Sequence, residues 1–327
     1  MSTGSWFLRT LALGMIGTTG LLALQRLSDQ PDDVVVIDKA ELVRSVILST
    51  PPEAQEVSLA DKLAKPRTSE KAVPNSTAQD AVPTQPPAES PPASTPASPP
   101  QPIGWEQSLP MYAQLFDSAT DLGMLSIGVA EGNMRVWSGE GKLFVQQTPA
   151  YFGHTDPGNL SWGERVTNFG PCSDQGYSGG DIELAEQYCV KRAKAQLPEQ
   201  LQDLAQAEIN PAQDVAAVLN TADLYNQASP IHSTRFPQAL RMAYQGGLSG
   251  VDAMSWARTA SFYLNSRQQL DIQNGTNKAS GLLGICARQG ETITEWDCVY
   301  RDQRRRAEAI NDVLLTYREV AGEQTTQ

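Results

Sequence analysis

The sequence predicts an α+β fold, mostly α-helical, with one folded domain over residues 104–322 behind an N-terminal membrane segment and a disordered proline-rich stalk. Three observations predict it. Helical periodicity recurs along most of the second half of the chain, one hairpin signature interrupts it near residue 140, and 13 of the 22 prolines lie between Pro51 and Pro102. A domain of this length buries a sizeable core without a cofactor or a metal ion, and we expect neither.

The charge of the chain narrows the possible functions. The formal net charge is −12, which repels the phosphates of nucleic acids, so we expect no nucleic-acid partner. It also disfavours a basic groove that holds a polyanionic glycan along its length. The basic run at residues 304–306 falls within a helical pattern and is interpreted as a solvated face, with an anion site as the alternative.

Residues 1–30 contain an apolar run, 6–24, which is interpreted as a membrane anchor. As a helix it spans roughly 28 Å, close to the ~30 Å hydrocarbon core of a bilayer. Arg9 can snorkel, Arg26 ends the run, and no small-residue cleavage site follows. We expect an uncleaved single-pass anchor in the inner (cytoplasmic) membrane with the C-terminal domain in the periplasm. A cleaved signal and a buried helix are the alternatives.

Residues 31–50 predict a short strand followed by a short helix. Val34–Ile37 is β-branched, and Asp38 with Glu41 forms a capping-box-like pair at the start of the helix. A helix this short is unstable alone, so we expect it to dock on something. The membrane segment together with this strand and helix resembles small inner-membrane components of conjugation machines, which implies an envelope protein partner through residues 34–49.

The proline-rich segment, residues 51–103, is expected to be extended and solvated. Proline fixes φ and removes a backbone donor, so neither helix nor sheet propagates through it. At about 3 Å per residue, the densest part, 81–103, reaches about 70 Å in a polyproline II conformation. It is interpreted as a stalk between membrane and domain, with a plain linker as the equal alternative.

The four cysteines, Cys172, Cys189, Cys286 and Cys298, lie in the predicted domain and lack the spacing of a zinc site. In an exported protein they predict two disulfides. The preferred pairing joins Cys172 to Cys189 and Cys286 to Cys298, one of three possible pairings. Four buried thiols in a cytosolic protein are the alternative.

The candidate catalytic residue is Glu131. A helical stripe over residues 108–128 runs into Glu131 and is stopped by Gly132, and a hairpin signature follows at residues 138–141. Partial desolvation raises the pKa of a carboxyl group, as a general acid needs near neutral pH. The alternative is an ordinary polar residue at a helix C-terminus, where the helix dipole disfavours an acid.

Residues 127–132, IGVAEG, resemble the segment around the catalytic glutamate in the lysozyme superfamily, in phage endolysins of the lambda-type transglycosylase and phage muramidase groups. The muramidase pattern implies a second acid nine residues on, where Glu140 stands in place of the usual Asp, and a Thr and a Gly-His, matched at longer spacing by Thr148 and His154. The string GHTDPGN is similar to uncharacterised cyanobacterial proteins with an EG…YFGHTDPGN core. The resemblance implies peptidoglycan, or a related glycan, as substrate.

Further candidates surround this segment. Asp156 competes with Glu140 as second carboxylate, although an Asx turn before Pro157 is its alternative role. Glu140 itself has the alternative of a solvated turn acid. The candidates for substrate binding are Thr148, Tyr151, His154, Asn159 and Arg258, with core packing the alternative for the Tyr151 ring.

Downstream, helical periodicity covers residues 182–197, 212–225, 237–244, 252–264 and 302–320, and residues 270–300 are expected to form a loop or hairpin clamped by a disulfide. Two functions follow. The first is a membrane-tethered peptidoglycan hydrolase or lytic transglycosylase with Glu131 as general acid. The second is a non-catalytic glycan-binding or scaffold protein of an envelope-spanning apparatus on the same body.

Overall fold

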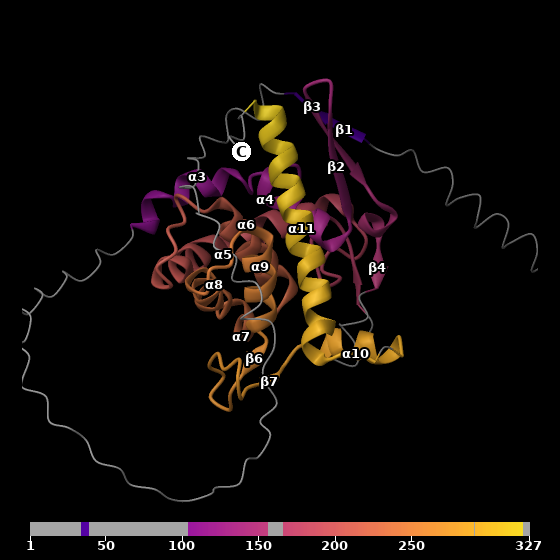
Figure 1. Cartoon of the computed structure of the whole chain (residues 1–327). Helices are drawn as coiled ribbons and strands as arrows, with labels where there is room; N and C mark the ends of the chain where they lie inside the picture. Colours follow the sequence, from indigo (N-terminus) through magenta and orange to yellow (C-terminus); the bar gives the residue numbers. More distant parts are fainter. Residues whose placement is uncertain (1–33, 39–103, 156–165, 291, 323–327) are drawn as a thin grey trace, which may run out of the picture. The chain divides into compact units, whose positions relative to one another are not determined.

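The computed structural model describes residues 34–38, 104–155, 166–290 and 292–322 (Figure 1). They form an α+β fold that is mostly helical with a few short strands, as the sequence predicts. The described residues divide into two compact units. Unit 1 holds residues 34–38, 115–155, 166–192 and 309–322, and unit 2 holds 104–114, 193–290 and 292–308. Two long helices, α5 (Ile182–Gln206) and α11 (Glu295–Ala321), contribute to both.

Unit 1 contains the predicted hairpin. Its elements are β1 (Val34–Ile37), α4 (Leu122–Glu131), β2 (Met134–Gly139), β3 (Lys142–Gln147), η2 (Pro149–Phe152), β4 (His154–Thr155) and β5 (Thr167–Asn168). Strands β2 and β3 pair antiparallel through a two-residue turn, Glu140 and Gly141, both with positive φ (53° and 71°). Two positive φ angles are typical of the type I′ turn, whose twist matches that of the strands.

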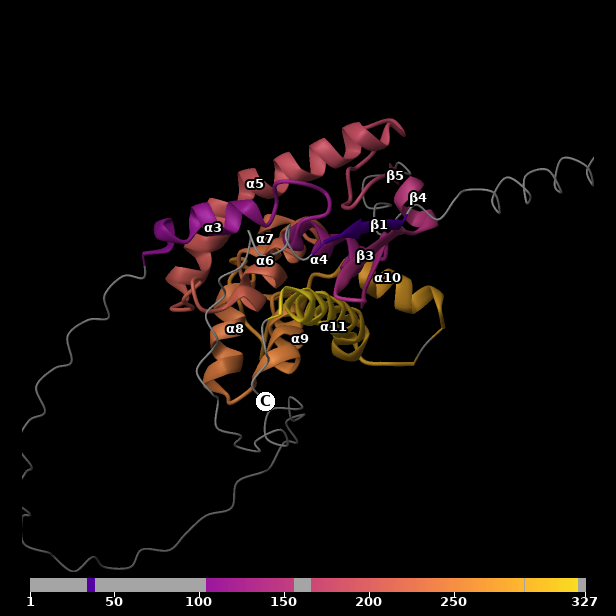
Figure 2. The ribbon, with the colours of Figure 1, turned by 90° about the horizontal axis from the view of Figure 1, so that it is seen from above.

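The predicted strand at Val34–Ile37 is confirmed as β1, and it pairs antiparallel with β3, giving a sheet of order β1-β3-β2. Figure 2 shows β1 beside β3 from above. The inward side chains Leu143, Val145 and Met134 are buried. In the sequence, β1 comes before the proline-rich segment. That segment therefore connects β1 to the rest of the fold, and it does not separate the apolar run from the first folded element.

Helix α4 is shorter than the stripe at residues 108–128 predicts, because the chain turns between α3 (Leu109–Gln114) and α4. The Asp121 carboxylate accepts a hydrogen bond from the Ser118 amide (2.6 Å), which favours a turn over a continuous helix. Nearly every side chain of α4 is buried. At Gly128 a Cβ atom would lie 2.6 Å from the Met134 sulfur, so glycine allows β2 to approach the helix closely.

Unit 2 is a helical body. Its elements are η1 (Trp105–Gln107), α3, α6 (Val215–Gln227), α7 (Pro230–Ser233), α8 (Phe236–Gln245), α9 (Gly250–Ala260), β6 (Tyr263–Leu264), β7 (Thr276–Asn277) and α10 (Ser280–Arg288). The segment 270–300, expected as a loop or hairpin, contains β7, which pairs with β6, then the helix α10, and from Glu295 the first residues of α11. The two glycines of α10, Gly281 and Gly284, weaken its helical signal in the sequence.

Both predicted disulfides are confirmed. Cys172 joins Cys189 in unit 1 with the Cα atoms 5.8 Å apart, and Cys286 joins Cys298 in unit 2 with the Cα atoms 6.3 Å apart. No helix in the described ranges is both long and apolar enough to span a bilayer. The apolar run 6–24, the helix predicted after Asp38 and the proline-rich segment 51–103 lie outside the described residues.

Candidate functional site

The C-terminus of α4 presents Glu131 at the surface of unit 1. Glu131 is the last residue of the helix and is half-buried. Gly132 follows with φ 85°, and its amide bonds the carbonyl of Val129 (3.0 Å), while the Asn133 amide bonds that of Gly128 (2.8 Å). These bonds satisfy helix carbonyls that otherwise lack a partner, so they fix the end of the helix, and with it Glu131.

Thr148 fastens the hairpin to this helix end. Its amide donates to the carbonyl of Asn133 and its hydroxyl donates to the carbonyl of Gly132, each over 2.9 Å. The half-buried Thr148 therefore lies against the residues that follow Glu131. The structure brings these two predicted site residues to the same place, and the hydroxyl of Thr148 is already used to hold the backbone.

Asn133 is a residue of this site that the sequence reasoning missed. Its side chain is fully buried, and Nδ2 donates to the carbonyl of Gly170 (2.9 Å). Oδ1 has no hydrogen-bond partner. Its position directly after Gly132, where the chain leaves the helix, is the only signal in the sequence. Asn133 thus joins the end of α4 to a loop almost forty residues further along the chain.

The loop that receives Asn133 is built around a buried carboxylate, Asp174. Its oxygens accept hydrogen bonds from the amides of Phe169 (2.9 Å), Gly176 (3.1 Å) and Ser178 (3.0 Å). Three backbone donors compensate for the loss of water around a buried anion. This arrangement gives the loop one shape, which presents the Gly170 carbonyl to Asn133.

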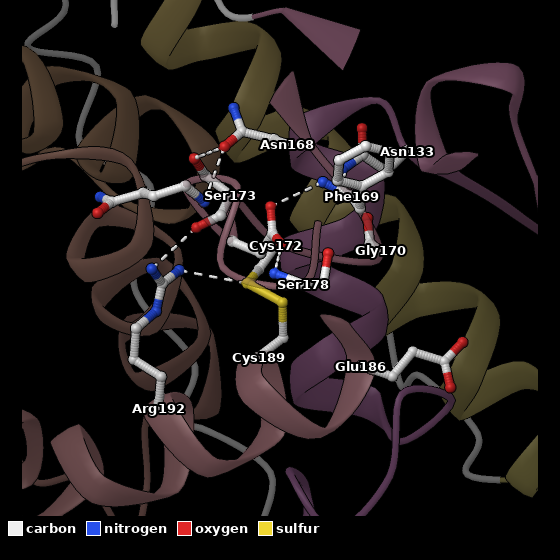
Figure 3. Close-up of a disulfide and its surroundings, with 12 residues drawn as sticks. Asn133, Asn168, Phe169, Gly170, Cys172, Ser173, Ser178, Glu186, Cys189 and Arg192 are labelled. Atoms are coloured by element: carbon white, nitrogen blue, oxygen red, sulfur yellow. Dashed lines mark hydrogen bonds between the residues drawn. A yellow bond between two sulfur atoms is a disulfide. The ribbon is translucent and has the colours of Figure 1, made fainter. Parts of the chain in front are cut away.

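A disulfide and a second buried asparagine complete the support (Figure 3). Cys172 ties the loop to Cys189 on α5, and Arg192 of the same helix donates to the Ser173 carbonyl (2.9 Å). The Asn168 Oδ1 atom accepts from the Ser173 hydroxyl (3.0 Å), whereas its Nδ2 has no partner. The loop that contacts Asn133 is therefore held by one disulfide and by several hydrogen bonds.

Tyr151 belongs to the core and not to a sugar-binding surface. Its ring has no exposed area, and its hydroxyl donates to the carboxylate of Glu186. Burial raises the pKa of Tyr151, and the bond to Glu186 raises it further. The sequence predicts this ring as a candidate for stacking on a sugar, but a side chain without exposed surface offers no face to a ligand.

His154 lies on β4, half-buried, at the far end of η2 from Thr148. Its Nδ1 atom lies 2.9 Å from the Ala150 carbonyl. Since a carbonyl only accepts, Nδ1 carries the proton in the neutral ring and Nε2 is the acceptor nitrogen. The His154 ring is oriented by the backbone and presents one basic nitrogen.

Glu140 and Arg258 differ from Glu131 in burial: Glu140 is exposed and Arg258 is fully buried. Glu140 is exposed at the hairpin turn, at the opposite end of β2 from α4. Arg258 belongs to unit 2 and is fully buried, where it contacts Asp223 at 2.6 Å and donates to Gln303 at 2.8 Å. The prediction that Arg258 contacts substrate does not fit this position, because the side chain is fully buried and its donors are used within the core. Asp156 and Asn159 lie outside the described residues.

Chemically, the described part of this region offers the half-buried Glu131 at the end of α4, with the Thr148 hydroxyl bonded to the Gly132 carbonyl and the His154 ring bonded to the Ala150 carbonyl. In the described ranges no three His, Cys, Asp or Glu side chains gather in a way that could hold a metal ion. Comparison with protein-family models, curated proteins and solved structures found no match. Function is therefore inferred from the residues themselves.

Proposed function

We propose that the protein binds peptidoglycan or a related cell-wall glycan and cleaves its glycosidic bond, with Glu131 as the general acid. The observation that carries the proposal is the half-buried Glu131 at the end of the buried helix α4, where the Gly132 cap fixes the backbone and a hairpin follows at once. A carboxyl group at the edge of an apolar element is suited to donate a proton to a leaving oxygen.

A single carboxyl group suffices for one of the two reactions in this class. Protonation of the glycosidic oxygen by Glu131 breaks the bond to the anomeric carbon, and the sugar's own hydroxyl then closes on that carbon and returns its proton to the carboxylate. Hydrolysis requires a second carboxylate at about 5 to 10 Å. The exposed turn position of Glu140 favours the lytic transglycosylase reaction.

The two disulfides support an oxidising location, because such bonds persist outside the reducing cytosol. Together with the apolar run 6–24, they support a single-pass protein of the inner membrane with both units in the periplasm. The proposed substrate lies in that compartment.

The test is a zymogram of the full chain on peptidoglycan. The β1 strand pairs with β3, so a version that begins at residue 104 lacks part of the sheet and is not suitable. We expect the wild type to clear the gel, Glu131→Gln to lose clearing, and Glu140→Gln to keep it. Clearing by Glu131→Gln that equals the wild type contradicts the proposal.

A second candidate function is a non-catalytic glycan-binding or scaffold protein of an envelope-spanning apparatus. It is favoured by the burial of Tyr151 and Arg258, which leaves fewer candidate groups for substrate contact. This function predicts retention of the full chain on insoluble peptidoglycan with no clearing, or capture of an envelope protein through residues 34–49.

A further inference from the structure

The outer face of the sheet β1-β3-β2 is apolar and open. Val36, Phe144 and Trp137 are direct cross-strand partners, so their side chains form one row across the three strands. The rings of Trp137 and Phe144 stack, with centroids 5.6 Å apart and planes at 9°. Val36 is 46% exposed and Trp137 40% exposed, in contrast with Leu143, Val145 and Met134 on the inner face.

Basic side chains flank this row. Alternation along the strands places Arg135 on the same face as Trp137, and Lys142 on the same face as Phe144. Arg135 is exposed. The Nζ atom of Lys142 lies 3.1 Å from the Asp38 carboxylate, the acidic group that alternation assigns to this face among the residues 34–38 and 134–147. The strand residues of this face therefore carry two basic side chains and one acidic one, and the acid Glu140 lies at the hairpin turn, on a chain whose net charge is −12.

The length of the chain limits how far this face can lie from the apolar run 6–24. Nine residues, 25–33, join the end of that run to Val34. At no more than about 3.6 Å per residue they span at most about 32 Å. Because β1 is itself a strand of the sheet, a membrane anchor in the run holds the sheet within that distance of the bilayer surface.

We propose that the outer face of β1-β3-β2 rests on an anionic lipid surface, with Trp137 at the headgroup level. The inference rests on the proposed membrane anchor and goes beyond the proposed catalytic function. Trp is enriched at membrane–water interfaces, and basic side chains beside it bind anionic headgroups. A face-to-face second copy is disfavoured, because it brings the Arg135 and Lys142 side chains of two copies together.

The test is photolabelling of the full chain in vesicles by a lipid that carries a diazirine in the interfacial region. Vesicles of phosphatidylethanolamine and phosphatidylglycerol are compared with vesicles of phosphatidylcholine, and labelled peptides are identified by mass spectrometry. Three variants are compared with the wild type: Trp137→Ser, Arg135→Glu and the matched control Tyr177→Ser, whose ring is 64% exposed elsewhere in unit 1.

We expect labelling of residues 134–147 in the anionic vesicles, and a fall of at least about fivefold in Arg135→Glu, because about fivefold corresponds to about 1 kcal/mol for the loss of one basic residue near an anionic surface and the variant also adds a negative charge. Arg135 is exposed on an edge strand, so this variant keeps the fold even if Trp137→Ser does not, and Tyr177→Ser labels like the wild type. Label on residues 6–24 without label on 134–147 overturns the proposal and leaves the anchor intact. Absence of label from both segments overturns the lipid contact and the membrane anchor. A cross-link from residues 134–147 to a protein, without lipid label, also overturns the lipid contact.

Discussion

The amide of Thr148 donates to the carbonyl of Asn133 over 2.9 Å, and this bond closes the base of the β2–β3 hairpin. Asn133 lies two residues after Glu131, so the hairpin and the helix α4 meet at the candidate acid. The position of Glu131 therefore depends on both elements. Changes at the hairpin base are expected to affect activity as well as stability.

Thr148→Val tests this relationship, because it removes the hydroxyl and retains the branched shape. The Gly132 carbonyl loses its partner, and we expect the free energy of unfolding to fall by about 1 kcal/mol and glycan cleavage to fall with it. Denaturant unfolding and a peptidoglycan release assay measure the two effects. Thr148→Ser keeps the hydroxyl and serves as the control. Equal behaviour of Val and Ser at this position shows that the hydroxyl is dispensable.

The buried ion pairs of unit 2 predict a large stability effect. Asp223 contacts Arg258 at 2.6 Å and Arg306 at 2.7 Å, with all three side chains buried. Asp223→Ala leaves two guanidinium groups buried without their carboxylate, so we expect a loss of about 3–5 kcal/mol in urea unfolding. Arg304→Ala, at a partly exposed ion pair, is the control, with a loss below about 1 kcal/mol. Similar losses in the two variants contradict this assignment.

The hairpin, the strand Val34–Ile37 and both disulfide pairings could be predicted from the sequence, because each depends on local signals: turn residues, β-branching and short cysteine spacing. The pairing of β1 with β3 could not be predicted, because β3 begins more than a hundred residues later and no local sequence pattern indicates the pairing. The burial of Arg258 escaped prediction for the same reason, because Asp223 lies 35 residues away.

At the candidate site, the order of helix, Glu131, Gly132 and hairpin was predictable, since the apolar stripe and the glycine mark the helix end. The role of Asn133 was not, because its partner, the Gly170 carbonyl, is positioned by Asp174 and the disulfide loop. Polar residues that act through a distant loop leave little trace in a single sequence.

His232 predicts a pH dependence of stability. Burial lowers the pKa of His232, the hydrogen bond to the Ser261 backbone opposes this, and the charge of Lys278 lowers it further. The unfolded chain then binds a proton at higher pH than the folded chain, so stability is full above about pH 6.5 and is lost as the pH falls through the lowered pKa of the folded state. We expect this slope in denaturant unfolding to disappear in His232→Gln. A slope of equal size in the variant assigns the effect to other groups.

The two disulfides are expected to differ in their effect on activity. Replacing Cys172 and Cys189 by Ala opens a loop with a sequence separation of 17 residues and is expected to cost about 3 kcal/mol of stability. It also releases the loop that presents Gly170 to Asn133, so cleavage falls at temperatures where the fold persists. The Cys286 and Cys298 pair, replaced in the same way in unit 2, is the control and lowers stability without this loss of activity. Equal activity of the two double variants contradicts the supporting role of the first disulfide.

The most direct test of Glu131 as the acid is the identity of the soluble products that the purified full chain releases from peptidoglycan, measured by mass spectrometry. We expect muropeptides with an internal anhydro ring, formed when the sugar's own hydroxyl replaces water, from the wild type and from Glu140→Gln, and none from Glu131→Gln. Release of the same products in the same yield by Glu131→Gln contradicts the assignment of this residue.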